Sequence, residues 1–347
     1  MKQTYNVNIE GHEALPTPEK IKKELPITSA ISENVYRYRK TIEAILSGKD
    51  KRTMVITGPC SIDHIGAALE YAEKLSKLSE EVSDRFFVIM RAYFEKPRTT
   101  VGWKGMIYDP CIDDSCRIEK GIRLARKFLL DLAGMGTPAA TEMLEPVIPQ
   151  YIADLISWAA IGARTTESQT HRQMASGLSM PTGFKNTTDG DIKVAIEAIK
   201  TAASKHTFLG VTDKGQMAFF KTKGNKFCHL VLRGGDTGPN YGSEYIAFAR
   251  ELMKKMNINP AIIIDCSHGN SFKKAEGQSI AFMDAINQIS KSEMSIRGLM
   301  LESYLKHGKQ ESGKGKKIVP GLSITDACIS WDETETLIRD AYSKIKI

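Results

Sequence analysis

Long apolar runs are missing from this sequence of 347 residues. The longest of them, such as residues 86–90, fall far short of the ~20 residues that a membrane-spanning helix requires. The first five residues lead into no apolar stretch of the kind that marks a secretory signal peptide. We therefore expect a cytoplasmic protein that has no membrane partner.

Paired cysteines are absent as well. The six cysteines, at positions 60, 111, 116, 228, 266 and 328, form no Cys-x-x-Cys pair and no zinc-finger spacing. In a reducing compartment such cysteines are free thiols unless another observation singles one of them out.

The sequence also lacks a concentrated patch of charge. Its 48 basic and 41 acidic residues give a net charge of +7, spread mostly along surfaces of mixed lysine and glutamate. A nucleic-acid-binding protein would gather such an excess in a patch interleaved with aromatic residues. The densest basic run, residues 306–317, contains glycine instead and predicts a flexible loop. The charge therefore favours anionic small molecules over nucleic acid as partners.

What the sequence does contain is a regular alternation of strands and helices. Short β-branched or aromatic runs alternate with longer segments of helical period, as in parallel βαβ units. Eight strands are predicted, at residues 54–57, 86–90, 139–141, 158–161, 181–184, 229–232, 261–264 and 296–300. Eight such units can close into a (β/α)8 barrel, an α/β fold, or can form an open doubly wound sheet. No Gly-x-Gly-x-x-Gly follows the first strand, which disfavours a dinucleotide-binding sheet.

Two segments lie outside this alternation. Residues 1–48 predict an extended arm of about 30 residues and a helix at 32–46, and residues 49–347 predict the barrel. Strand-like runs at 208–212 and 216–222 surround a turn and predict a hairpin inserted at about 207–223. The hairpin contributes to packing or assembly unless a further role is found for it.

Residues that can carry out chemistry end the predicted strands. In chain order these residues are Cys60, Arg91, Glu142, Arg164, Lys185, Arg233, His268 and Glu302. Because a barrel gathers the carboxyl ends of its strands at one face, we expect these side chains to surround one cavity. The four cations among them would repel one another without an anionic partner. A phosphate together with a carboxylate would satisfy them.

The other strand ends suit a metal ion. Cys60, His268 and Glu302, with Asp326 from a later segment, offer thiolate, imidazole and carboxylate groups. This mixed set favours a divalent transition ion over magnesium or calcium. Each residue also has a plainer interpretation, since a single cysteine is usually a small buried hydrophobic residue. Residues 96–100, with two basic side chains and two hydroxyls around a proline, predict a second phosphate site or a solvated basic turn.

Several ordered motifs contain these residues and extend over nearly the whole chain. The motifs are residues 58–61, 96–100, 102–105, 162–169, 183–186, 232–235, 265–270 and 323–329. In them the sequence resembles the 3-deoxy-D-arabino-heptulosonate-7-phosphate (DAHP) synthases of the microbial, metal-dependent type. The resemblance implies a (β/α)8 barrel with an N-terminal extension and an inserted hairpin. It also implies condensation of phosphoenolpyruvate with erythrose 4-phosphate at the start of aromatic amino acid biosynthesis.

The resemblance also implies roles for individual residues. The phosphoenolpyruvate ligands would be Arg91, Ala163, Arg164, Lys185 and Arg233. The erythrose 4-phosphate ligands would be Arg98 and Thr99, with Lys96 between the substrates and Asp326 beside them. The ligands of one divalent metal ion (Mn, Fe, Co or Zn) would be Cys60, His268, Glu302 and Asp326. The residues expected to take part in catalysis are Lys96, Glu142 and His268.

The resemblance implies regulation and assembly too. An aromatic amino acid would inhibit the enzyme from a cavity beside the hairpin, and the chain would form a homodimer or homotetramer. Gly210 stands where phenylalanine-sensitive relatives carry serine, so we expect tyrosine as the preferred inhibitor and phenylalanine as the second. The chain departs from its relatives at Asp63-His64, where we assign His64 no role, and in the longer acidic loop at 236–238.

Three other functions remain open at this point. A 3-deoxy-octulosonate-phosphate synthase would use the same phosphoenolpyruvate chemistry, but that family resembles Lys-Ala-Asn-Arg where this chain reads Lys-Pro-Arg-Thr-Thr. A metal-dependent aldolase on the same barrel would need fewer cations. A basic metal-binding or nucleic-acid-binding protein would instead present its arginines on the surface.

Overall fold

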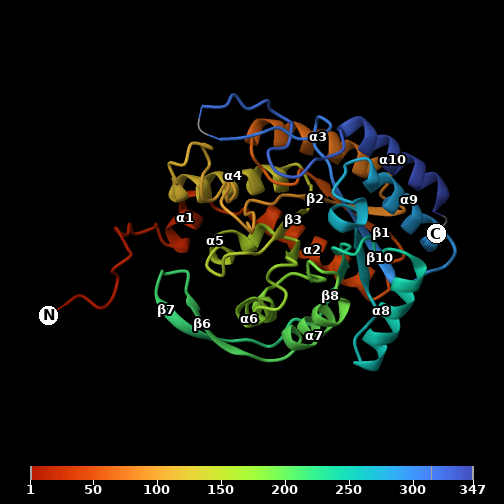
Figure 1. The fold of residues 1–347 in the computed structure, drawn as a ribbon, viewed down its shortest axis with the longest axis horizontal. Coiled ribbons are helices and arrows are strands. Elements are labelled where there is room, and N and C mark those ends of the chain that lie inside the picture. Colours follow the sequence, from red (N-terminus) through yellow and green to blue (C-terminus); the bar gives the residue numbers. More distant parts are fainter. Residues whose placement is uncertain (1, 314, 346–347) are drawn as a thin grey trace.

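The computed structural model describes residues 2–313 and 315–345, which form a closed barrel of eight parallel strands surrounded by helices (Figure 1). The barrel strands are β1 (Thr53–Gly58), β2 (Phe86–Arg91), β3 (Ala139–Glu142), β4 (Trp158–Ile161), β5 (Thr182–Lys185), β8 (Cys228–Leu232), β9 (Ile262–Asp265) and β10 (Ile296–Glu302). The α-helices are α1 (Pro18–Glu24), α2 (Ser29–Leu46), α3 (Ile65–Glu81), α4 (Ile118–Gly134), α5 (Pro149–Ile152), α6 (Gln169–Gly177), α7 (Ile192–Ala202), α8 (Ser243–Lys255), α9 (Gly277–Ser290) and α10 (Trp331–Lys344). Two short 3-10 helices, Ala153–Leu155 and His268–Ser271, complete the order.

The sheet closes because β1 pairs in parallel with both β2 and β10. This closure confirms the predicted (β/α)8 barrel and excludes the open doubly wound sheet. All eight predicted barrel strands are present, with ends that differ from the predicted ones by at most two residues. The fifth, for example, begins at Thr182 rather than at residue 181.

Side chains that point into the barrel form a core of their own. Met54, Ile56, Trp158 and Met300 belong to this inner cluster, and Ile42, Ile45 and Leu46 of α2 belong to it as well. Helix α2 therefore closes the amino-terminal end of the barrel with apolar side chains. The carboxyl-terminal end is left open for a polar cavity.

The hairpin consists of β6 (Thr207–Val211) and β7 (Met217–Lys221), which pair with each other and not with the barrel. In Figure 1 the hairpin runs beneath α6, and its tip points towards α1. The tip docks there through the N–H of Glu19, which donates to the carbonyl of Asp213 (2.8 Å), and through the Lys22–Asp213 ion pair (2.9 Å).

The prediction of an extended arm over the first 30 residues is wrong for Pro18–Glu24, which forms α1. The Thr17 side chain accepts from the N–H of Lys20, and Pro18 occupies the first helical turn, where a proline is tolerated. Helix α2 begins at Ser29 rather than at residue 32, because Thr28 caps it in the same way. Within the described part of the chain, no helix has the length and apolar character needed to cross a membrane.

A neutral histidine lies inside the barrel. Nε2 of His229 accepts from the indole N–H of Trp158 (3.0 Å), and Nδ1 donates to the carbonyl of Phe227 (3.0 Å), which leaves no site for a second proton. Burial lowers the pKa of His229 to about 4. In the unfolded chain this histidine has its ordinary pKa of about 6.5. Below that pH the unfolded state therefore binds more protons than the native state, and the native state loses stability.

We predict that His229→Gln makes the protein less sensitive to acid. Between pH 7.5 and pH 5, the unfolding free energy of the wild type should fall by about 2 kcal/mol relative to that of the variant. Urea-induced unfolding at both pH values measures this difference. The exposed His12→Gln variant is the control and should show no such change. A difference between wild type and His229→Gln that does not vary with pH would refute the assignment.

Candidate active site

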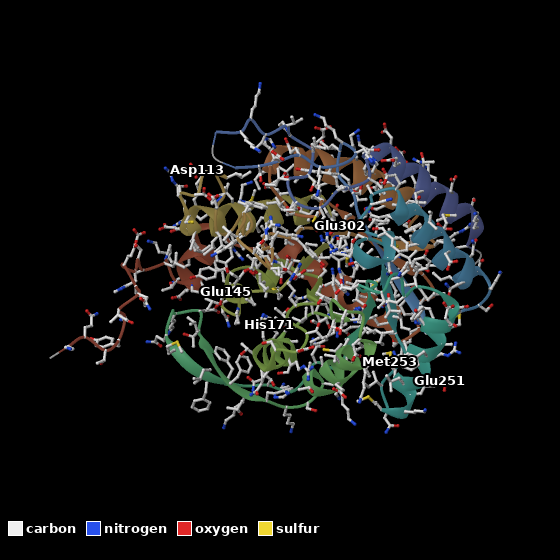
Figure 2. All side chains as sticks on the ribbon, in the orientation of Figure 1. Asp113, Glu145, His171, Glu251, Met253 and Glu302 are labelled. Atoms are coloured by element: carbon white, nitrogen blue, oxygen red, sulfur yellow. The ribbon has the colours of Figure 1, made fainter. Side chains whose placement is uncertain are left out.

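A cavity of about 690 Å³ opens at the carboxyl-terminal end of the barrel. Arg91, Glu142, Lys185 and Glu302 are the last residues of β2, β3, β5 and β10, so the barrel itself sets their positions. The predicted substrate and catalytic residues all line this cavity, namely Arg91, Lys96, Arg98, Thr99, Glu142, Ala163, Arg164, Lys185, Arg233, His268 and Asp326. Glu302, labelled in Figure 2, lies at its floor beside the buried Cys60.

Two of the four predicted cations are held by buried carboxylates. Nη2 of Arg91 donates to Oε1 of Glu302 (2.8 Å), and Nζ of Lys185 donates to Oδ2 of Asp265 (2.9 Å). All four of these side chains are at least 96% buried. Although burial acts to raise it, the ammonium of Lys185 and the neighbouring His268 hold the pKa of Asp265 well below its usual range.

The other two cations have weaker partners. Nε of Arg164 donates to the hydroxyl of Thr99 (3.1 Å), and Nη1 of Arg233 donates to the carbonyl of Gly234 (3.4 Å). Among residues 2–313 and 315–345, neither guanidinium has a carboxylate within salt-bridge distance. Two of the four cations that converge on the cavity, the exposed Arg164 and the buried Arg233, therefore remain without a carboxylate partner, and the cavity suits an anionic ligand.

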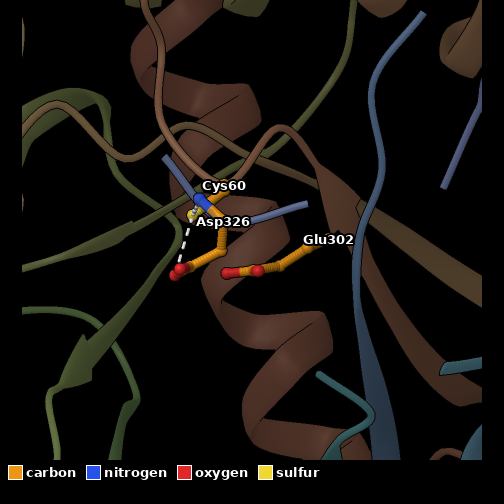
Figure 3. A group of neighbouring side chains, drawn as sticks. All are labelled: Cys60, Glu302 and Asp326. Atoms are coloured by element: carbon orange, nitrogen blue, oxygen red, sulfur yellow. Dashed lines mark hydrogen bonds between the residues drawn. The ribbon is translucent and has the colours of Figure 1, made fainter. Parts of the chain in front are cut away.

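Cys60, Glu302 and Asp326 can together bind a metal ion, because one ligand atom of each lies within 4.8 Å of the other two (Figure 3). Sγ of Cys60 lies 3.5 Å from Oδ2 of Asp326, the contact that is dashed in Figure 3. Nε2 of His268 lies 3.8 Å from Oε1 of Glu302, so the fourth predicted ligand borders the same group. Burial, with Glu302 as a further cause, raises the pKa of the Cys60 thiol to about 12. A cation at this point would favour the thiolate, and the donor set fits a divalent transition ion.

Lys96 lies between the metal-ligand group and the cavity. Its Nζ donates to Sγ of Cys60 (3.0 Å) and to the carbonyl of the same residue (3.4 Å). Although burial acts in the opposite direction, Cys60, Glu302 and Asp326 raise the pKa of Lys96 above its usual range. Lys96 is therefore a protonated amine that faces the cavity.

Glu142 lines the cavity and has one carboxyl oxygen without a partner. Its Oε1 is buried and has no hydrogen-bond partner among the described residues. Gly162 packs directly against this carboxyl group, since a Cβ at that position would lie 2.3 Å from Oε1. A buried carboxyl oxygen without a partner is costly, so Glu142 is a candidate for contact with a ligand or a reacting water molecule.

Two residues that the sequence pattern does not single out, Asp265 and Asp63, hold these groups in place. Asp265 contacts both Lys185 and Nδ1 of His268 (3.2 Å), an arrangement that orients a metal-binding histidine. Asp63 accepts from the hydroxyl of Tyr304 (3.1 Å) and the N–H of Ile324 (3.3 Å), and so it anchors the segment that carries Asp326. Asp265 could have been noticed because it belongs to the same motif as His268. No feature of the sequence around Asp63 indicates its role, because its partners lie more than 200 residues away in the chain.

Both departures from the family pattern have structural explanations. Nδ1 of His64 accepts from the N–H of Ala67 and caps α3, away from the cavity. The acidic loop is a tight turn in which Gly235 and Gly238 exchange backbone hydrogen bonds, and Asp236 reaches the cavity wall.

A second cavity lies beside the hairpin, where an inhibitor site is expected. Gly210 lines this separate space of about 600 Å³, which lies between the hairpin, α6 and the segment that leads into α5.

Comparison with known proteins gives matches along almost the whole chain. The family described as the DAHP synthetase I family matches residues 24–339. The Tyr-sensitive phospho-2-dehydro-3-deoxyheptonate aldolase of Escherichia coli K12 is 47% identical over 341 residues, 98% of this chain and 96% of that protein. The Phe-sensitive enzyme of the same organism is 47% identical over 344 residues, 99% of this chain and 98% of that protein. A solved structure of phospho-2-dehydro-3-deoxyheptonate aldolase from Francisella tularensis SCHU S4 is 45% identical, covers 97% of this chain and 98% of its own, and has a TM-score of 0.95.

We predict that Cys60→Ala abolishes tight metal binding without unfolding the barrel. Loss of an outer-shell partner typically weakens metal binding by about 10–100-fold, so loss of a direct thiolate ligand should cost at least about 100-fold. Titration calorimetry with Mn²⁺ measures the affinity, and circular dichroism checks the fold. Cys228→Ala removes a buried thiol outside the metal-ligand group and should bind Mn²⁺ as the wild type does. Wild-type affinity in Cys60→Ala would show that the thiolate is not a ligand.

Proposed function

The chain belongs to the DAHP synthetase I family, and we propose that it condenses phosphoenolpyruvate with D-erythrose 4-phosphate and water to give DAHP and inorganic phosphate. This reaction is the first step of aromatic amino acid biosynthesis. The observation that carries the proposal is the cavity at the carboxyl end of the barrel, in which four cations converge beside a metal-ligand group. The similarity to two curated enzymes over almost their full length supports the same conclusion.

Phosphoenolpyruvate occupies the inner part of the cavity in this proposal. Its phosphate and carboxylate are bound by Arg91, Arg164, Lys185 and Arg233, with the backbone at Ala163 near the phosphate. Support comes from Arg164 and Arg233, whose guanidinium groups have no carboxylate partner among the described residues. A ligand with both a phosphate and a carboxylate supplies the missing negative charge.

Erythrose 4-phosphate enters from the side of the segment after β2. Its phosphate is bound by Arg98 and Thr99, and its aldehyde points towards Lys96 and Asp326. The contact between Thr99 and Arg164 (3.1 Å) supports this placement, because it brings the two phosphate sites next to each other. Two anionic substrates that repel each other in water are thus held together, which accounts for much of the catalysis.

One divalent ion (Mn, Fe, Co or Zn) is held by Cys60, His268, Glu302 and Asp326. When bound, it supplies Lewis-acid stabilisation for negative charge on the aldehyde oxygen. The mixed sulfur, nitrogen and oxygen donors suit several first-row ions.

The reaction begins when C3 of phosphoenolpyruvate attacks the aldehyde carbon and the C–C bond forms. Lys96 donates a proton to the aldehyde oxygen as negative charge develops there. A water molecule then adds to C2 of the former enol, and Glu142 accepts the proton that this water releases. The resulting hemiketal phosphate collapses to the ketone: the C2–O bond to phosphate breaks, the hydroxyl proton at C2 passes to the departing phosphate, and inorganic phosphate leaves.

The hairpin cavity forms the inhibitor site in this proposal. It is lined by Phe208, Gly210 and Phe220 on one side and by Met174 of α6 on the other, a size and polarity that suit an aromatic amino acid. We favour tyrosine, with phenylalanine second, because Gly210 leaves room for the phenol oxygen. The relatives named Tyr-sensitive and Phe-sensitive support regulation of this kind.

Assembly into a homodimer or homotetramer is also proposed. Tyr5, Val7, Leu209, Met217 and Phe219 are each 64–77% exposed, so the N-terminal segment and the outer face of the hairpin offer apolar surface for a second copy. Apolar surface of this kind is typical of interaction sites.

A phosphate-release assay tests the proposed function. Metal-loaded protein should release phosphate from phosphoenolpyruvate when erythrose 4-phosphate is added, and a chelator should stop the reaction. Arabinose 5-phosphate, the substrate of the octulosonate branch, should give little release. Faster release with arabinose 5-phosphate, or no release with either sugar phosphate, would overturn the proposal.

We predict that single arginine variants separate the two phosphate sites. Arg98→Ala should raise the KM for erythrose 4-phosphate about 10–100-fold and leave that for phosphoenolpyruvate nearly unchanged, whereas Arg164→Ala should do the reverse. The reason is the loss of a charge-assisted hydrogen bond worth about 1.5–3 kcal/mol. Lys104→Ala, an exposed change outside the cavity, is the control for steady-state kinetics. Equal effects of either arginine variant on both substrates would show that the sites are misassigned.

We predict that Gly210→Ser shifts inhibition from tyrosine towards phenylalanine. A Cβ at this position would lie 2.9 Å from the ring of Phe220, so the serine displaces that ring by a few tenths of an ångström and reduces the space for a phenol oxygen. The ratio of the two inhibition constants should change about tenfold, within the range of allosteric coupling energies of ~1–3 kcal/mol, while uninhibited turnover stays intact. Dose–response curves for both amino acids measure this ratio. Activity of the wild type that stays flat with all three aromatic amino acids at millimolar concentration would leave the hairpin with a structural role only.

A further inference from the structure

Glu95 is a buried acid that the proposed reaction does not use. Glu95 is only 2% exposed and directly precedes Lys96 in the segment that follows β2. No cation among the described residues pairs with it. Instead, Oε2 accepts from the N–H of Leu144 (3.4 Å), and Oε1 accepts from the N–H of Glu145 (3.2 Å) and the hydroxyl of Tyr108 (3.4 Å).

These contacts join three parts of the cavity wall. Glu95 belongs to the segment that carries Lys96 and Arg98, whereas Leu144 and Glu145 follow Glu142 at the end of β3. Tyr108 lies in the turn after residue 105 that closes the same loop. One carboxyl group thus connects the segment proposed to bind erythrose 4-phosphate with the segment that carries the unpaired oxygen of Glu142.

The segment after β3 and the segment that contains Lys96 differ in where their backbone groups form hydrogen bonds. The Leu144 carbonyl accepts from Nε2 of His171 on α6 (2.8 Å), and the N–H of Met143 donates to Ala160 on β4 (3.0 Å). Figure 2 labels Glu145 and His171, which flank this region. The backbone N–H of Lys96, in contrast, donates within its own loop, to the carbonyl of Lys104 (2.9 Å). The segment after β3 is therefore the fixed side, and Glu95 attaches the loop to it.

We propose that Glu95 is a positioning residue that fixes Lys96 and the Arg98–Thr99 segment for the second substrate. This inference rests on the proposed function for the identity of that substrate. Loss of the carboxyl group loosens the backbone of this segment, where Lys96 keeps its side-chain contact with Cys60, while the segment after Glu142 keeps the supports from His171 and Ala160. The effect is therefore specific to erythrose 4-phosphate and to the step in which Lys96 donates a proton.

Glutamine is the informative replacement. Burial, together with the neighbouring Glu145 and Glu142, raises the pKa of Glu95 to about 8, but both oxygens of a carboxyl group accept hydrogen bonds in either protonation form. A glutamine of the same shape has one accepting oxygen and an NH₂ group that cannot accept from a backbone N–H. Glu95→Gln therefore breaks one of the two backbone contacts without leaving a cavity.

Steady-state kinetics of the metal-loaded full-length protein test the proposal. Glu95→Gln should raise the KM for erythrose 4-phosphate about tenfold and change that for phosphoenolpyruvate less than about twofold, as expected for a lost hydrogen bond of a buried acid. Tyr108→Phe removes only the hydrogen bond from the phenol hydroxyl and should shift the same KM in the same direction, by about twofold to threefold. If Glu95→Gln does not fold, the KM values of Tyr108→Phe test the proposal instead. Glu145→Gln changes an exposed side chain on the same segment and should behave as the wild type.

Limited proteolysis adds a readout that does not depend on the reaction. Trypsin should cleave after Arg98 severalfold faster in Glu95→Gln than in the wild type or in Glu145→Gln, because the loop is released. Faster cleavage together with an inactive wild type would support the positioning role and overturn the proposed function instead. Equal increases in both KM values, or cleavage and kinetics that match the wild type, would overturn the role of Glu95.

Discussion

The site depends on two buried carboxylates that each serve two partners. Glu302 binds the guanidinium of Arg91 and also belongs to the metal-ligand group, and Asp265 binds Lys185 and contacts His268. Removing either carboxylate would leave a buried cation unpaired, which is strongly destabilising. The same sharing ties the proposed phosphoenolpyruvate ligands to the proposed metal ligands. A substitution among the proposed metal ligands should therefore also affect the proposed phosphoenolpyruvate ligands, and the reverse.

The barrel supplies this arrangement through its geometry. Strand ends meet at one mouth, and the apolar side chains of α2 close the opposite end, so the charged residues at the strand ends gather around the mouth. Segments beyond the strands complete the site by attaching to it. Asp63 anchors the segment of Asp326, and Glu95 bridges the loops after β2 and β3. Each anchor uses backbone N–H groups, so the positions of whole segments are fixed rather than those of single side chains.

Much of this could be predicted from the sequence, because barrel strands buried on both faces read as short apolar runs and their ends carry the reactive residues. The convergence of those strand ends on one cavity is confirmed, whereas the individual roles remain predictions. The sequence did not reveal α1, a helix of seven residues that depends on the Thr17 cap and on docking against Asp213. It did not reveal Asp63 or Glu95 either, since their partners lie far away in the chain. Local pattern shows which residues are unusual, but long-range hydrogen bonds decide what such residues hold in place.

The proposed binding site for phosphoenolpyruvate is the mouth of the barrel, where two of the four converging cations have no carboxylate partner among the described residues. Thermal unfolding of the metal-loaded protein at increasing phosphoenolpyruvate concentration tests it most directly, because a ligand that binds only the native state raises Tm as its concentration grows. We expect a Tm that rises by several degrees at saturating phosphoenolpyruvate, and a smaller rise when salt is increased. A Tm that does not change with phosphoenolpyruvate, at low or high salt, would contradict the account.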